Sequence, residues 1–171
     1  MKVLNNLLKI NGQCVYQNYG AFLVEERQGD LSNYEELLKP PAMKPYTSVS
    51  FREEDGEKLP ERLPSPCFEA RDVTLYFALV AENKQSWMSN YDKFVRMLKS
   101  GEKANGEKGD GWLRIEVAEL GKTYKMYYKQ CSQYSQITPL EDGKTVAAKL
   151  KVVLREPNPA VRVITEKINA I

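Results

Sequence analysis

Few side chains in this sequence could do chemistry, because its 171 residues include no histidine. Histidine is the usual general base of hydrolytic triads and the commonest metal ligand in proteins. The three cysteines, Cys14, Cys67 and Cys131, are far apart and form no C-x-x-C pair, whereas a structural zinc ion needs four ligands. We therefore predict reduced thiols, no metal site and no cofactor.

Two other chemical patterns are weak. Adjacent acids such as Glu25-Glu26 and Glu35-Glu36 could serve glycoside hydrolysis only if two carboxylates faced each other across a cleft. The glycine-rich run 106–111 contains two acidic residues and follows no strand, which argues against a phosphate-binding loop. We predict that the chain is not an enzyme and has no catalytic residues.

The composition indicates a folded protein. Hydrophobic residues make up 42% of the chain and charged residues 28%, which is typical of a globular domain, and we expect one domain over residues 1–171. The 25 basic and 23 acidic residues leave a net charge of +2, too little to predict nucleic-acid binding. No apolar run reaches the roughly 18 residues that a membrane span requires, so we predict no membrane partner.

The central part of the chain has the clearest periodicity. From 72 to 81, apolar residues alternate with others, which predicts a strand with one apolar face. Asn83 can then cap an amphipathic helix over about 83–99, whose apolar side chains recur at the helical period from Trp87 to Leu98. Gly101 follows as the expected C-terminal cap.

Further strands follow the helix. Residues 112–117 and 122–131 predict an antiparallel hairpin, and the alternation over 146–154 predicts another long strand. Towards the start of the chain we expect short strands and a helix that begins at Ser32 and stops before Pro40. The predicted fold is mainly β (α+β): an antiparallel β-sandwich or barrel flanked by one amphipathic helix.

A long stretch in the first half of the chain shows neither the strand nor the helix periodicity. Residues 40–66 contain six of the nine prolines and the charged run 52–58. Proline cannot donate to a strand ladder and unpaired charges are costly to bury, so we predict an extended, exposed arm. A loop of this length is usually functional or disordered. At the other end, we expect residues 160–171 to form a C-terminal tail.

Tyrosine is frequent, with ten residues in the chain. Tyr127 and Tyr128 are adjacent in a predicted strand, so one of them must point away from the core, and we expect this to be Tyr127. An outward tyrosine can form a protein interface or stack on a sugar, or it can simply occupy a half-buried position in a sheet.

The order of these elements resembles a known family. Phe68 to Leu75, the helix that ends in 94–98, the hairpin of 112–117 and 124–131, and the strand that runs into 155–159 are together similar to the N-terminal domain of distal tail proteins of long-tailed bacteriophages. They resemble the tail-tube fold more loosely. The resemblance implies antiparallel strands flanked by a helix, and subunits joined edge to edge in a hexameric ring between tail tube and baseplate. Distal tail proteins usually carry a second, C-terminal domain, and this sequence runs about twelve residues beyond Pro159.

The resemblance and the missing catalytic residues lead to one functional hypothesis. We expect a structural protein of a phage or prophage tail or baseplate, made in the bacterial cytoplasm and located in the virion tail, whose partners are further copies of itself and other tail proteins. The residues that we expect at the assembly interface are Arg52, Glu53, Glu54, Asp55, Lys58 and Tyr127. The alternative is a small carbohydrate-binding module that uses surface tyrosines.

Overall fold

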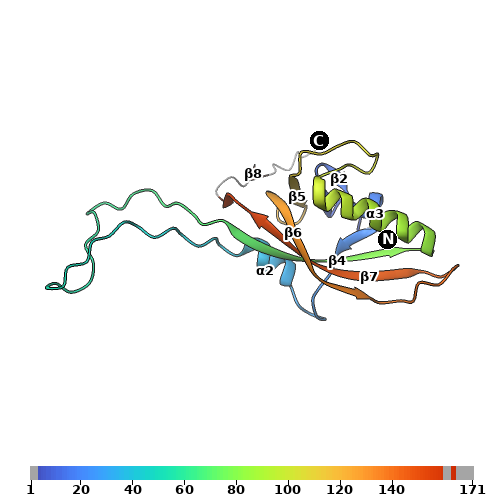
Figure 1. Cartoon of the computed structure of the whole chain (residues 1–171), viewed down its shortest axis with the longest axis horizontal. Helices are drawn as coiled ribbons and strands as arrows, with labels where there is room; N and C mark the ends of the chain where they lie inside the picture. Colours follow the sequence, from blue (N-terminus) through green and yellow to red (C-terminus); the bar gives the residue numbers. More distant parts are fainter. Residues whose placement is uncertain (1–3, 160–162, 165–171) are drawn as a thin grey trace.

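The computed structural model describes residues 4–159 and 163–164 of the chain. Figure 1 shows a curved sheet, with a long helix on one side and a segment that projects far from it. The strands are β1 (Leu8–Ile10), β2 (Gln13–Cys14), β3 (Ala21–Leu23), β4 (Arg71–Ala81), β5 (Leu113–Val117), β6 (Lys122–Gln136), β7 (Val146–Glu156) and β8 (Val163–Ile164). The helices are α1 (Val15–Tyr19), α2 (Ser32–Leu38) and α3 (Lys84–Ser100). Apart from β8, the predicted tail 160–171 lies outside the described residues.

The strands form one antiparallel sheet in the order β2-β1-β5-β6-β7-β4-β3, with β8 also paired to β6. The prediction of a mainly β, antiparallel fold is confirmed, but the predicted barrel is wrong because the sheet is not closed. Within the described part of the chain, its end strands β2 and β3 have only two and three residues and do not pair with each other. Helix α1 connects them and packs against both, so a helix stands between the two ends of the sheet.

Strand β6 also prevents a division into two separate sheets. Its residues 122–126 pair with β5, and its residues 127–136 pair with β7. One strand therefore belongs to both halves of the sheet, and side chains from both halves meet in one hydrophobic core.

Strands β4 and β7 form the centre of this core. They pair over the whole of β4, and every second residue of β7 from Val146 to Glu156 is buried. The alternate residues, among them Lys149, Lys151 and Arg155, lie on the opposite side of the sheet and are partly exposed. We call this side of β4, β6 and β7 the outer face, because α3 covers the other side.

Helix α3 has the ends and the apolar side that its sequence predicts. The Asn83 side chain accepts a hydrogen bond from the Ser86 N–H at 2.8 Å, and Gly101 ends the helix in a left-handed conformation with φ of 71°. The Phe94 ring is fully buried, with its centroid 5.4 Å from that of Phe77 in β4. Instead of the one predicted flanking helix, the described part of the chain contains three, because the short α1 and α2 also pack on the sheet.

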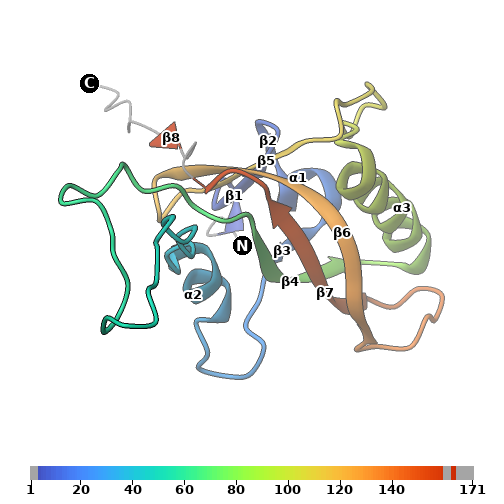
Figure 2. The same cartoon turned by 60° about the vertical axis from the view of Figure 1, so that its left-hand side comes forward.

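Residues 39–70, between α2 and β4, leave the sheet and return (Figures 1 and 2). Within them, Met43 forms a β-bridge with Phe68 near the sheet, and Val49 forms another with Lys58 at the far end. We call residues 39–70 the projecting segment and the turn 49–58 its tip. The stretch 40–66, predicted as an exposed proline-rich arm, falls within this segment.

Candidate functional site

The projecting segment begins and ends beside one arginine, Arg71, the first residue of β4. Its Nε donates to the Glu156 carboxylate at 2.5 Å, and Glu156 is only 1% exposed. The same guanidinium donates to the backbone carbonyls of Glu36, Leu37 and Lys39, at 3.0, 3.2 and 2.5 Å. Because these carbonyls lie at the end of α2, one side chain joins the last turn of α2, the start of β4 and the end of β7. We call this cluster the root.

Helix α2 also covers the free edge of β4. The Asn33 amide donates to the Val24 carbonyl at 2.7 Å, and its oxygen accepts from the Tyr76 N–H at 2.8 Å. The Glu36 carboxylate accepts from the Thr74 N–H at 3.0 Å. Backbone groups that an edge strand would otherwise leave open are thus satisfied by side chains, so this part of β4 is not available to a strand from another molecule.

The tip is a small hairpin that is held by its own contacts. Val49 and Lys58 exchange two backbone hydrogen bonds, of 3.1 and 2.7 Å. The Lys58 ammonium lies 2.6 Å from the Glu54 carboxylate and 5.0 Å from the centre of the Phe51 ring. Of the predicted interface residues, Glu54 and Lys58 are therefore brought together by the turn itself.

The other predicted tip residues are exposed and remain without a charged partner. Arg52, Glu53 and Asp55 form no ion pair within the described residues. Their charges therefore do not contribute to the turn and are available to another molecule.

The projecting segment also exposes apolar side chains, which the sequence analysis did not single out. These are Met43, Val49, Phe51, Leu59 and Leu63, which are between 39% and 53% exposed. Single exposed apolar residues are ordinary on protein surfaces, but several on one projecting segment are typical of an interaction surface.

Tyr127 lies on β6 in the body of the molecule, away from the tip. It pairs with Arg155 across the ladder, which places its side chain on the outer face, as predicted, and it is 40% exposed. Its ring meets Trp112 edge-on at 5.9 Å. Tyr134 is equally exposed but pairs with Leu150, so it lies on the opposite side of the sheet and packs against Tyr91 of α3. These two exposed tyrosines of β6 therefore do not form one platform for a sugar.

The second half of β6 leaves one edge open. Strand β5 pairs only with residues 122–126, so beyond Met126 that edge has no strand partner in the described part of the chain. The register with β7 shifts twice, between Tyr128 and Gln130 and between Cys131 and Gln133. Such bulges twist an edge and hinder continuous pairing with another strand.

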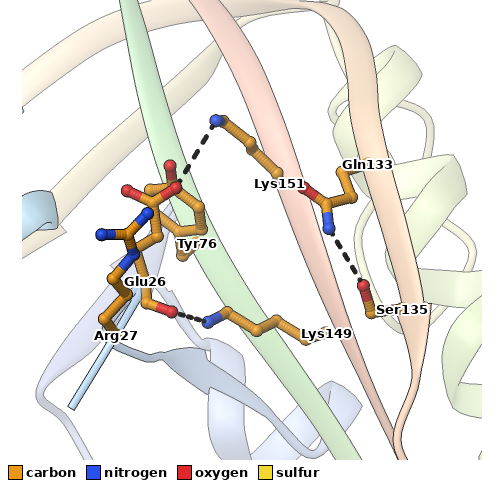
Figure 3. A pocket seen from close by; sticks show the side chains of 7 residues that line it. All are labelled: Glu26, Arg27, Tyr76, Gln133, Ser135, Lys149 and Lys151. Atoms are coloured by element: carbon orange, nitrogen blue, oxygen red, sulfur yellow. Dashed lines mark hydrogen bonds and ion pairs between the residues drawn. The ribbon is translucent and has the colours of Figure 1, made fainter.

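The outer face holds a polar cavity of about 260 Å³ (Figure 3). It is lined by Glu26 and Arg27 from the loop after β3, Tyr76 from β4, Gln133 and Ser135 from β6, and Lys149 and Lys151 from β7. The two lysines flank the Tyr76 ring, with ammonium-to-centroid distances of 5.5 and 5.3 Å. We call this the outer-face cavity.

The lysines of the cavity differ in their partners. Lys149 donates to the backbone carbonyls of Glu25 and Glu26, at 2.5 and 2.8 Å, and so holds the loop after β3 against the sheet. Lys151 makes a long ion pair with the Glu26 carboxylate, at 3.8 Å. A hydrogen bond with the Tyr76 side chain raises the pKa of Lys151 above its ordinary value.

Sequence reasoning missed the root, the edge contacts of α2 and the cavity. Asn33 offered one signal, because it lies four residues before the buried Leu37, and a polar residue on the apolar side of a short helix often has a buried partner. Arg71 and the two lysines offered none, since their partners come from parts of the chain that are distant in sequence.

Neither a membrane-spanning helix nor a metal-binding cluster is present among the described residues. They contain no helix long and apolar enough to cross a membrane. Within the same ranges, no three His, Cys, Asp or Glu side chains lie together so that they could hold a metal ion. Cys14 is buried, whereas Cys67 and Cys131 are exposed free thiols.

No protein-family model matches the sequence, and no curated protein matches it. Among solved structures, the chain is similar to the crystal structure of Dit (gp 19.1) of phage SPP1, described as a paradigm of the hub adsorption apparatus in phages that infect Gram-positive bacteria. The similarity covers 88% of this chain at 12% sequence identity, with a TM-score of 0.45. The chain spans about half the length of that protein, 50% of which is covered.

Proposed function

We propose that this chain is a structural, non-catalytic component of a phage or prophage tail or baseplate, and that its copies assemble into a ring through the projecting segment. Two observations support this. The order of strand, helix, hairpin and strand that resembles distal tail proteins in the sequence is the order of β4, α3, β5, β6 and β7. The projecting segment is anchored at its root and exposes both apolar and charged side chains at its far end.

The exposed apolar side chains of the projecting segment carry the proposal. Covering one half-exposed side chain of this kind gains on the order of 1 kcal/mol. Five such side chains on one segment therefore favour contact with another molecule, and in a ring each segment would meet the next subunit.

The open edge of β6 is a second possible contact between subunits. Its two bulges and polar sequence make it a weaker basis for assembly than the projecting segment. In the proposed ring of six subunits, which would connect tail tube and baseplate, the segment provides the main contact and the edge adds to it.

The test is to remove the segment while the fold is kept. Lys44 donates a backbone hydrogen bond to the Cys67 carbonyl at 2.8 Å, so a four-residue Gly/Ser turn can replace residues 45–66 between them. Light scattering after size-exclusion chromatography should give about 118 kDa for the full chain, six times its 19.6 kDa mass, and a folded monomer for the shortened chain. An oligomer of unchanged mass after the replacement would refute this role of the segment.

A further inference from the structure

The tip and the outer-face cavity carry opposite charges that remain unpaired. At the tip, the carboxylates of Glu53 and Asp55 have no ion pair within the described residues. In the cavity, the exposed guanidinium of Arg27 makes no side-chain hydrogen bond or ion pair in the same part of the chain. Each surface therefore offers charged groups that the other could complement.

The balance of charge around the cavity favours an anion. Its lining has three cationic side chains, Arg27, Lys149 and Lys151, against one carboxylate, that of Glu26. Lys149 has two backbone partners, and Lys151 has a hydrogen bond with the Tyr76 side chain and a long ion pair with Glu26. In Figure 3, Arg27 and Lys151 lie on either side of Glu26, and both line the same cavity.

The tip lies away from the outer-face cavity of its own chain. Figure 1 shows the projecting segment running away from the sheet that carries the cavity. From Lys39 to Glu53 the segment can extend at most about 50 Å. A body of about 140 residues has a radius of gyration of about 14 Å and is therefore roughly 35–40 Å across. The segment is thus long enough to extend over a neighbouring subunit.

We propose that the tip of one copy docks into the outer-face cavity of a neighbouring copy, with Glu53 and Asp55 facing Arg27 and Lys151. This inference rests on the proposed function and adds the receiving surface to it. Arginine and carboxylate form short, charge-assisted hydrogen bonds that fix orientation, so this contact would set the register between subunits.

Charge reversal tests the docking directly. One variant carries Arg27→Glu and Lys151→Glu, and therefore has an acidic tip and an acidic cavity. The other carries Glu53→Arg and Asp55→Lys, and has a basic tip and a basic cavity. Each variant alone should associate at least tenfold more weakly than the unaltered chain in sedimentation velocity. An equimolar mixture should regain the association, because each tip then finds an opposite cavity.

The mixture separates docking from damage to the fold. A variant that merely misfolds would not recover in the presence of the other, and circular dichroism of each variant checks this. Lys93→Glu, at an exposed position of α3, is the matched control and should associate normally. If both charge-reversed variants associate like the unaltered chain, or if their mixture fails to recover, the docking site is refuted.

A second measurement keeps this result distinct from the proposed ring. A fluorescent peptide of residues 47–60 is titrated with the full chain and followed by anisotropy. The peptide should bind the unaltered chain and bind at least tenfold more weakly to the Arg27→Glu, Lys151→Glu variant. Charge-dependent peptide binding, together with association of the full chain that stops short of six subunits, would support the docking and refute the ring. Oligomers that require the projecting segment but are unaffected by charge reversal would support the ring and refute the docking.

Discussion

The two ends of the projecting segment are built on opposite principles. At the root, the Arg71 guanidinium pairs with the Glu156 carboxylate, which is 1% exposed, and binds three backbone carbonyls besides. At the tip, the Glu54–Lys58 pair is formed by side chains that are 51% and 60% exposed. The charges of the root therefore stabilise the fold, whereas those of the tip contribute little to it and can serve association.

The strongest test of this difference is Arg71→Ala. It removes the Arg71 guanidinium from the buried Glu156 carboxylate, and loss of one member of a buried pair costs about 3–5 kcal/mol of unfolding free energy. Urea denaturation followed by circular dichroism measures the loss. At the tip, Lys58→Ala removes a pair in open solvent and should cost less than about 1 kcal/mol.

The double variant Arg71→Met, Glu156→Gln provides the control for the root. With no buried charge left, it should lose clearly less stability than Arg71→Ala. Equal losses for Arg71→Ala and Lys58→Ala would show that the root and the tip do not differ in the way described.

A second change removes the contact between α2 and the edge of β4. Asn33→Ala leaves the Val24 carbonyl and the Tyr76 N–H without their side-chain partner, and we expect it to cost about 2 kcal/mol of unfolding free energy. Asn33→Asp retains the acceptor for the Tyr76 N–H but loses the donor to Val24, so it separates the two bonds. Stability unchanged by Asn33→Ala would mean that α2 does not close this edge.

The hydrophobic periodicity of the sequence was enough to predict the long elements that have one buried side. The alternation over 72–81 and the helical stripe over 83–99 correspond to β4 and α3, because each pattern records one buried side of one element. Near the start of the chain, the helix predicted from Ser32 corresponds to α2, but α1 was not predicted, since five residues are too few to show a period. The open sheet was not predicted either, because closure depends on which strands meet at its ends.

The candidate site was predicted only in part, for a similar reason. Proline and charge content indicated an exposed stretch, and the tip lies within it. The root depends on Arg71 and Glu156, which are 85 residues apart, and the cavity joins Arg27 to Lys151 across most of the chain. Contacts of this kind leave no local signal in a single sequence.

The tip should respond to substitution in association and not in stability. Val49→Ser and Phe51→Ser replace apolar side chains that are 53% and 48% exposed, so unfolding free energy should change by less than about 0.5 kcal/mol. If the segment forms the subunit contact, the same changes should weaken association at least tenfold in sedimentation velocity. Met88→Ser, at a residue of α3 that is 41% exposed, is the matched control and should leave association unchanged. A similar loss with Met88→Ser would remove the distinction between tip and body.

The smallest expected effect concerns Asp72, the neighbour of Arg71 that points to the outer face. Its carboxylate lies 2.7 Å from the Lys129 ammonium and 2.9 Å from the Arg155 guanidinium, and these hydrogen bonds, that of Lys129 first, lower the pKa of Asp72 below its ordinary value. A lowered carboxyl pKa adds stability above the pKa of the unfolded chain, and this contribution is lost as pH falls through the folded value. Asp72→Asn should therefore reduce stability at pH 7, by no more than about 0.5 kcal/mol because the side chain is 40% exposed, and by less at pH 3.

Urea denaturation at both pH values, each in low and high salt, measures this dependence. Salt should reduce the effect of Asp72→Asn at pH 7, because solvent-exposed charges are screened, but should leave the larger effect of Arg71→Ala nearly unchanged. Arg71 and Asp72 are adjacent in β4 and each is paired with the opposite charge. Their contributions to the unfolding free energy would then differ severalfold, because the partner of Arg71 is buried. If the two effects were equal in size and in salt dependence, burial could not explain why the root holds the fold while the outer face and the tip tolerate change.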